Sequence, residues 1–215
     1  MKLRQHLKFL VLLIIFFNAS CSNDQHEKTV VVSDTSITWP AIKDTSGIRY
    51  PQDFVNTLVA LIEKKVRQID STVFQDSIYL ENEDFLEQLP DGGASLTGFF
   101  NNGRLMKIKD WIGLSYGIKQ HSYYFNNDHL IYVSENEDDF DVNDSTGIDH
   151  SKFGQHSHGG YYFNNLKLIN METLGHNTFE DAEYEPQKAF LEACDSYRKL
   201  LLYKHKKSRW PSRFP

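Results

Sequence analysis

Two stretches of the chain carry apolar residues at the spacing of one helix face. The first begins at Pro51, whose fixed φ suits the start of a helix. Its apolar positions are Val55, Leu58, Val59, Ile62, Val66 and Ile69. The second runs from about Pro186 to Lys204 and carries Phe190, Cys194, Tyr197 and Leu201 on one side. This helical period predicts an amphipathic helix at each end of a folded region.

Between these helices the pattern changes to strand-like alternation, and one string of residues recurs three times. The copies lie at 99–106, 124–131 and 162–169 and share the order aromatic-Phe-Asn-Asn-x-basic-Leu-apolar. Aromatic and β-branched residues favour strands, whereas Asn and Gly tolerate the positive φ of tight hairpin turns. Each copy therefore predicts strand–turn–strand. We expect an α+β fold, in which an antiparallel β-meander of about six to seven strands has both helices packed on one face.

The hairpin strings resemble those of exported bacterial lipoproteins of unknown function, in which Tyr-Phe-x-Asn-Gly-x-Leu recurs along a β-meander. They are also similar, more distantly, to the aromatic-Asn-Gly repeats of MORN-type and antitoxin-like families. Only the first copy keeps the Asn102-Gly103 pair. The resemblance implies a sheet scaffold and assigns no catalytic residue.

The first twenty residues have the pattern of a bacterial export signal. A basic segment, 1–8, precedes nine apolar residues, 9–17. At about 1.5 Å per residue this run is too short to cross the roughly 30 Å of a bilayer's hydrocarbon, so it indicates a signal core. Residues 18–21 resemble the lipobox of lipoproteins, in which small residues precede an obligatory cysteine. The resemblance implies lipidation of Cys21.

Lipid on Cys21 implies that the exported protein is anchored to a membrane of the bacterial cell envelope, because several acyl chains give stable attachment. Asn18 stands where the lipobox family prefers an aliphatic residue, so ordinary secretory cleavage and an uncleaved membrane anchor are the alternatives. The predicted organisation is a signal peptide at 1–20, a lipidated cysteine with a flexible tether at 21–48, an α+β hairpin-repeat domain at 49–207 and a disordered tail at 208–215.

The composition argues against nucleic-acid binding and against disulfide bonds. The net charge of −6 argues against nucleic acid, which binds basic surfaces. Cys21 and Cys194 are the two cysteines of the sequence, so lipidation of the first removes the partner of the second and leaves no disulfide framework. Cys194 lies on the apolar side of the last helix, which favours a buried structural thiol.

One short string, Gly113-Leu114-Ser115-Tyr116-Gly117, matches the G-x-S-x-G motif of serine hydrolases. That motif needs a strand before the serine and a helix after it. Strand patterns lie on both sides here, so we interpret the string as the turn between two strands of the meander.

An acidic segment at 139–150 begins like a calcium-binding loop, with Asp139, Asp141 and Asn143 at alternating positions. Asp144 and His150 replace the Gly and Glu that an EF-hand requires at its sixth and twelfth positions. The pattern favours a solvated loop, with weak calcium binding as the alternative.

Three histidines, His150, His156 and His158, could surround a zinc ion if they converged. No cysteine or zinc-protease spacing accompanies them, so a loop leading into the third hairpin is the simpler interpretation. We therefore expect no cofactor, and keep calcium or zinc as weak alternatives.

Aromatic pairs in the second and third hairpins suggest a binding surface. Neighbours on a strand point to opposite faces, so about half should face outward unless a helix covers them. The candidate residues are Tyr123, Tyr124, Tyr161 and Tyr162.

Together these features predict a lipid-anchored binding or assembly module of the cell envelope without catalytic activity, with a protein or glycan as partner. The alternatives are a metal-dependent hydrolase that uses His150, His156 and His158, and an immunity or antitoxin-like protein that binds one partner.

Overall fold

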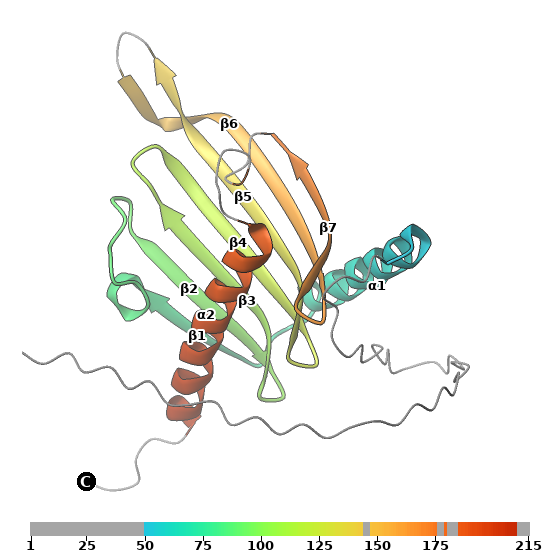
Figure 1. Ribbon diagram of the computed structural model, residues 1–215. Coiled ribbons are helices and arrows are strands. Elements are labelled where there is room, and N and C mark those ends of the chain that lie inside the picture. Colours follow the sequence, from blue (N-terminus) through green and yellow to red (C-terminus); the bar gives the residue numbers. More distant parts are fainter. Residues whose placement is uncertain (1–49, 144–146, 176–178, 180–184, 210–215) are drawn as a thin grey trace, which may run out of the picture. The chain divides into compact units, whose positions relative to one another are not determined.

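The computed structural model describes residues 50–143, 147–175, 179 and 185–209 (Figure 1). These residues form an α+β fold of two α-helices and a seven-stranded antiparallel sheet, with a short 3-10 helix after the first strand. In chain order the elements are α1 (Gln52–Asp70), β1 (Asp76–Glu81), η1 (Asn82–Asp84), β2 (Ala94–Asn101), β3 (Arg104–Gly113), β4 (Gly117–Asn126), β5 (His129–Asn143), β6 (Gly147–Asn164), β7 (Lys167–Leu174) and α2 (Pro186–Arg209).

The seven strands follow one another across the sheet in the order of the sequence, so the predicted meander is confirmed. Both predicted helices are present as well. Helix α1 starts directly after Pro51, and α2 extends to Arg209. The helix therefore includes Ser208 and Arg209, which the sequence had assigned to the tail. Residues 210–215, like the signal and tether at 1–49, lie outside the described residues.

The three repeated strings form three hairpins of the same design. Their two central turn residues all have positive φ, as the predicted turns require. These pairs are Asn102-Gly103, Asn127-Asp128 and Asn165-Leu166. Each hairpin also has a register shift between the two aromatic residues of its string, at Phe99/Phe100, Tyr124/Phe125 and Tyr162/Phe163. The last residue of each string is left out of the pairing, so the repeat encodes a β-bulge as well as a turn.

The two helices cover opposite faces of the sheet, so the prediction that they share one face is wrong. The ring of Tyr123 contacts Phe190 and Tyr197 of α2. The hydroxyl of the next residue, Tyr124, lies 3.2 Å from the carboxylate of Asp70 at the end of α1. Because neighbouring residues of a strand point to opposite faces, α1 and α2 lie on different sides. Figure 1 shows α2 crossing in front of the sheet.

The physical reason lies in the aromatic pairs of the repeats. Each pair sends one large ring to either face, so both faces need a cover. The face under α2 holds the larger apolar cluster, which includes Phe100, Tyr123, Phe125, Tyr161 and Phe163 from the strands and Phe190, Cys194 and Leu201 from α2. The face under α1 receives Tyr124 and Tyr162, and α1 buries Val55, Leu58, Ile62 and Ile69. Burial on both faces stabilises the sheet.

Candidate functional site

The four tyrosines proposed as an outward-facing surface are all buried. Their exposed fractions are 1% for Tyr123, 5% for Tyr124, 0% for Tyr161 and 4% for Tyr162. Tyr123 and Tyr161 lie under α2, whereas Tyr124 and Tyr162 donate hydrogen bonds toward Asp70 and Glu63 of α1. These tyrosines therefore do not form an exposed binding surface, although Tyr123 lines a cavity under α2 that is described below.

The acidic segment expected to be a loop is part of a long β-hairpin. Strand β5 continues to Asn143 and β6 begins at Gly147, so Asp139, Asp141 and Asn143 are strand residues. The three residues between these strands lie outside the described residues. A strand spreads alternate side chains along its length instead of curling them around one point. This geometry differs from a calcium-binding loop.

The three histidines of the zinc hypothesis have separate neighbours. Nδ1 of His156 lies 2.6 Å from Asp138, and Nδ1 of His158 lies 2.9 Å from the side-chain oxygen of Asn136. His150 instead packs edge-on against the ring of Phe140. Within the described ranges, no three His, Cys, Asp or Glu side chains are grouped so that they could hold a metal ion.

The G-x-S-x-G string is a hairpin turn, as predicted. Gly113 ends β3 and Gly117 begins β4, and the backbone N–H of Leu114 donates to the carbonyl of Gly117 at 2.8 Å. Because a strand follows Ser115 where a nucleophile elbow needs a helix, Ser115 does not have the backbone geometry of a hydrolase nucleophile.

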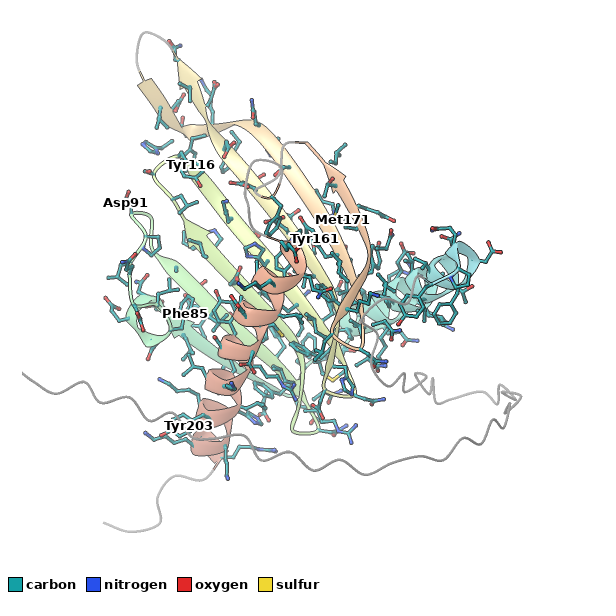
Figure 2. The ribbon with its side chains drawn as sticks, in the orientation of Figure 1. Phe85, Asp91, Tyr116, Tyr161, Met171 and Tyr203 are labelled. Atoms are coloured by element: carbon teal, nitrogen blue, oxygen red, sulfur yellow. The ribbon has the colours of Figure 1, made fainter. Side chains whose placement is uncertain are left out.

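A cavity of about 400 Å³ lies between α2 and strands β3, β4 and β5. Its wall is largely apolar and aromatic, and its polar side chains come from the sheet. The lining residues are Asp110, Ile112, Lys119, His121, Tyr123, Glu135, Phe179, Ala189, Phe190, Ala193 and Tyr197. Figure 2 shows Tyr161, which packs against Phe190 with ring centroids 4.6 Å apart, beneath the N-terminal part of α2. Small ligands bind in such concave, mainly apolar sites with a few polar groups.

The polar side of the cavity is a buried ion cluster centred on His121. Nδ1 of its imidazole lies 2.8 Å from Oδ1 of Asp110, and Nε2 lies 3.4 Å from Oε1 of Glu135. The backbone N–H of His121 also donates to Oδ1 of Asp110 at 2.8 Å. Asp110 is 2% exposed and Glu135 is 3% exposed. We call Asp110, His121 and Glu135 the ion cluster.

Tyrosine hydroxyls complete the hydrogen bonding of the carboxylates. The hydroxyl of Tyr161 donates to Oε2 of Glu135 at 2.8 Å, and that of Tyr123 lies 3.5 Å from Oδ2 of Asp110. Burial raises the pKa of Tyr161 far above its ordinary value, and the negative charge of Glu135 raises it further. Tyr161 therefore keeps its proton and remains a donor at neutral pH.

The carboxylates keep His121 charged. Burial by itself lowers the pKa of His121, but the charges and hydrogen bonds of Asp110 and Glu135 outweigh burial and raise this pKa to about 10. Burial likewise acts to raise the pKa of Glu135, but the hydrogen bond and charge of His121 lower it on balance. At neutral pH the cluster is therefore an imidazolium between two carboxylates.

This arrangement does not suit His121 to the role of a general base. A general base needs a free lone pair near neutral pH, whereas both ring nitrogens of His121 face carboxylates and its pKa is about 10. Among the described residues that line the cavity, none is Ser, Thr or Cys. Cys194 of α2 is buried, as predicted, and burial raises the pKa of its thiol to about 12, which keeps it unreactive.

Sequence reasoning missed the ion cluster, although one signal for it exists. Ile108, Asp110 and Ile112 alternate along β3, so Asp110 occupies a core-facing position between two apolar ones. A charged residue on the buried side of a strand is rarely tolerated without a partner. That signal points to Asp110 but not to His121 or Glu135.

Neither described helix has the length and the uninterrupted apolar character that crossing a membrane requires. Comparisons of the chain with protein-family models, with curated proteins and with solved structures found no match.

Proposed function

We propose that this protein is a binding module of the bacterial cell envelope that takes up a small ligand in the cavity between α2 and the sheet. Lipid on Cys21 holds it to a membrane, and the segment at 22–48 links the anchor to the folded domain. The domain binds its ligand and does not transform it.

The observation that carries this proposal is the cavity itself. A volume of about 400 Å³ is well above that of the occasional voids in a packed core, and apolar walls meet fixed polar groups on one side. The polar groups are held in place by one another, because His121 lies between Asp110 and Glu135. Such preorganisation lowers the cost of ordering the site when a ligand binds.

The test uses three probes with the same apolar body and different charge, namely 2-phenylethanol, 2-phenylethylamine and 3-phenylpropionate. Each is titrated by calorimetry into the full-length protein in a nonionic detergent at pH 7. We expect at least one probe to bind saturably with one site per chain. Ala193→Phe places a large ring in the cavity wall and should abolish that binding.

A control variant separates blocking of the cavity from a general effect on α2. Glu192 is the neighbour of Ala193 on the same helix and is exposed, so Glu192→Phe adds the same ring outside the cavity. Binding should survive in this variant. If none of the three probes binds the wild type, or if Ala193→Phe binds as the wild type does, the proposed function is wrong.

A further inference from the structure

A second pocket lies at the end of the sheet where the repeated strings form their turns. The turns between β2 and β3, β4 and β5, and β6 and β7 share this end, which is the lower end in Figure 1. A pocket of about 430 Å³ lies between the first two of these turns and α1. Seven of its nine lining residues are polar or charged, and four of them are asparagines, Asn101, Asn102, Asn126 and Asn127. The cavity under α2 shares none of the nine, so the two sites are separate.

Turn geometry explains the second asparagine of each string but not the first. Asn102 and Asn127 have φ of 51° and 48°, which asparagine adopts more readily than most residues. Asn101 and Asn126 are instead the last residues of β2 and β4. Strands favour β-branched and aromatic residues over asparagine. The first asparagine of each string therefore serves a purpose other than the turn.

Asn126 has the properties of a ligand-binding side chain. It lines the pocket, yet its exposed fraction is 8%. Within the described ranges, no hydrogen bond or ion pair engages its side chain. A buried amide without a partner lowers stability, and this amide offers two donor hydrogens and an acceptor oxygen. Hydroxyl groups both donate and accept hydrogen bonds, so a ligand that carries hydroxyls satisfies such an amide.

The pocket wall also carries positive charge. Lys65 of α1 and Arg104 of β3 line it, and no ion pair among the described residues includes either of them. Asp128 is the acidic residue of the wall, and Arg198 of α2 lies 3.9 Å from its carboxylate. Even without Arg198, two cations face one carboxylate, so the wall is positive on balance. Ammonium and guanidinium groups bind carboxylates and phosphates through charge-assisted hydrogen bonds.

We infer that this pocket binds an anionic sugar, a ring of hydroxyl groups that carries one carboxylate or phosphate. The asparagine amides bind the hydroxyls, and Lys65 and Arg104 bind the anionic group. A cavity of about 150 Å³ accommodates benzene, so about 430 Å³ has room for one sugar ring with its substituents. This inference concerns a different site from the proposed function and does not depend on it.

NMR of the asparagine side-chain amides tests the inference. The ¹⁵N-labelled full-length protein, in a nonionic detergent without a sugar head group, is titrated at pH 7 with glucuronate, glucose 6-phosphate, glucose, acetate and inorganic phosphate. An anionic sugar should shift the amide signals of Asn126 saturably. It should leave in place those of Asn56, which accepts a hydrogen bond from Gln52 near the start of α1. Asn126→Ala identifies the signals of Asn126, because this variant lacks them.

The relative affinities of the five probes decide whether both parts of the ligand are recognised. At least one anionic sugar should bind about tenfold more tightly than glucose, because a partly exposed ion pair is worth up to about fivefold and the pocket offers two cations. Acetate and inorganic phosphate lack the hydroxyls and should bind at least fivefold more weakly than the matching sugar. No saturable shift with either anionic sugar would overturn the inference. A preference below about threefold over glucose or over the simple anion would do the same.

Charge-removing variants assign the binding to this pocket. Lys65→Gln and Arg104→Gln should each lower the affinity for the anionic sugar about fivefold. Lys64→Gln is the matched control, because Lys64 is the exposed neighbour of Lys65 on α1 and does not line the pocket. All three changes remove one positive charge, so the difference between them isolates the pocket. If neither Lys65→Gln nor Arg104→Gln binds more weakly than Lys64→Gln, the inference is wrong.

Discussion

The imidazole of His121 and the carboxylate of Asp110 face each other across strands β4 and β3, with Nδ1 and Oδ1 2.8 Å apart. The same oxygen accepts the backbone N–H of His121, so Asp110 fixes both the ring and the strand that carries it. Asp110 is almost completely shielded from water. The same two residues therefore stabilise the sheet and form part of the polar wall of the cavity.

Replacement of His121 by Ala should destabilise the protein strongly. The change leaves Asp110 and Glu135 buried without their cation, which costs about 3–5 kcal/mol for the loss of one partner of a buried pair. Urea unfolding followed by tryptophan fluorescence measures the difference in unfolding free energy. The exposed pair of His156 and Asp138 gives the control, because His156→Ala should cost less than about 1 kcal/mol. Equal losses in the two variants would contradict a special role for the buried cluster.

Stability should fall as the pH rises from about 6.5 to 10. The pKa of His121 is about 10 in the folded protein, compared with about 6.5 in an unfolded chain. A raised pKa means that the folded state binds the proton more tightly, so this contribution is complete below pH 6.5 and is lost as pH rises through the folded value. The slope from one such group is at most about 1.4 kcal/mol per pH unit.

A variant isolates the contribution of His121 to this pH dependence. Between pH 6.5 and 8.5 the unfolding free energy of His121→Gln should be nearly constant, whereas that of the wild type declines. Above pH 8.5 the unfolding free energy also falls because of the buried Cys194 and the buried tyrosines. Burial raises their pKa values, so these groups lose their protons more readily in the unfolded chain. The lower range is therefore the informative one, and parallel curves there for the two proteins would refute the assignment.

Leu166→Gly should stabilise the third hairpin. Leu166 has φ of 64°, so its backbone adopts a strained left-handed conformation. Its side chain is 58% exposed and therefore buries little apolar surface to offset this strain. The left-handed region costs an L-residue roughly 1–2 kcal/mol, of which the added flexibility of glycine in the unfolded chain returns part. We expect a gain of about 1 kcal/mol, or a melting temperature raised by about 2–4 °C. The equivalent position in the first hairpin is Gly103, with φ of 73°, so Gly103→Leu should have the opposite sign.

Replacement of Cys21 by Ser tests the anchor. The change removes the nucleophile that receives the lipid, so the lipoprotein pathway should stall and the precursor should accumulate. Buried acyl chains contribute about 0.8 kcal/mol per CH₂, more than any surface contact of the domain could replace. Metabolic labelling with a clickable palmitate analogue should mark the wild type alone. Equal labelling of both proteins, or a cleaved Cys21→Ser protein that stays with the membrane, would contradict lipidation of Cys21.

The turns and the strand order could be predicted because their causes are local. Asn102-Gly103 and the two equivalent turn pairs favour positive φ in adjacent residues. A two-residue turn places the strands on either side of it next to each other, so these strands pair. The side on which each helix packs could not be predicted in this way. The aromatic pairs of the repeats offer large rings on both faces, and a pattern of this kind does not say which helix covers which face.

The ion cluster depends on register, which the sequence specifies less directly. His121 pairs with Glu135 because a bulge between Tyr124 and Phe125 shifts strand β5 by one residue. Without that shift, counting from the Asn127-Asp128 turn would place His121 opposite Ser134. A register shift of one residue turns every side chain to the other face. Because the bulge was not predicted from the sequence, Glu135 could not be identified as the partner of His121.

Methyl NMR of the full-length protein in nonionic detergent tests the central claim, that the cavity under α2 is the binding site, most directly. Ile112 lines the cavity, whereas Ile118 of strand β4 lies beside Phe140 and His150 in a separate depression. With isoleucine methyl groups labelled with ¹³C, titration with the probe that binds by calorimetry should shift the δ1 methyl signal of Ile112 saturably and leave that of Ile118 in place. A saturable shift at Ile118 with none at Ile112, or no saturable shift at either residue, would contradict the account.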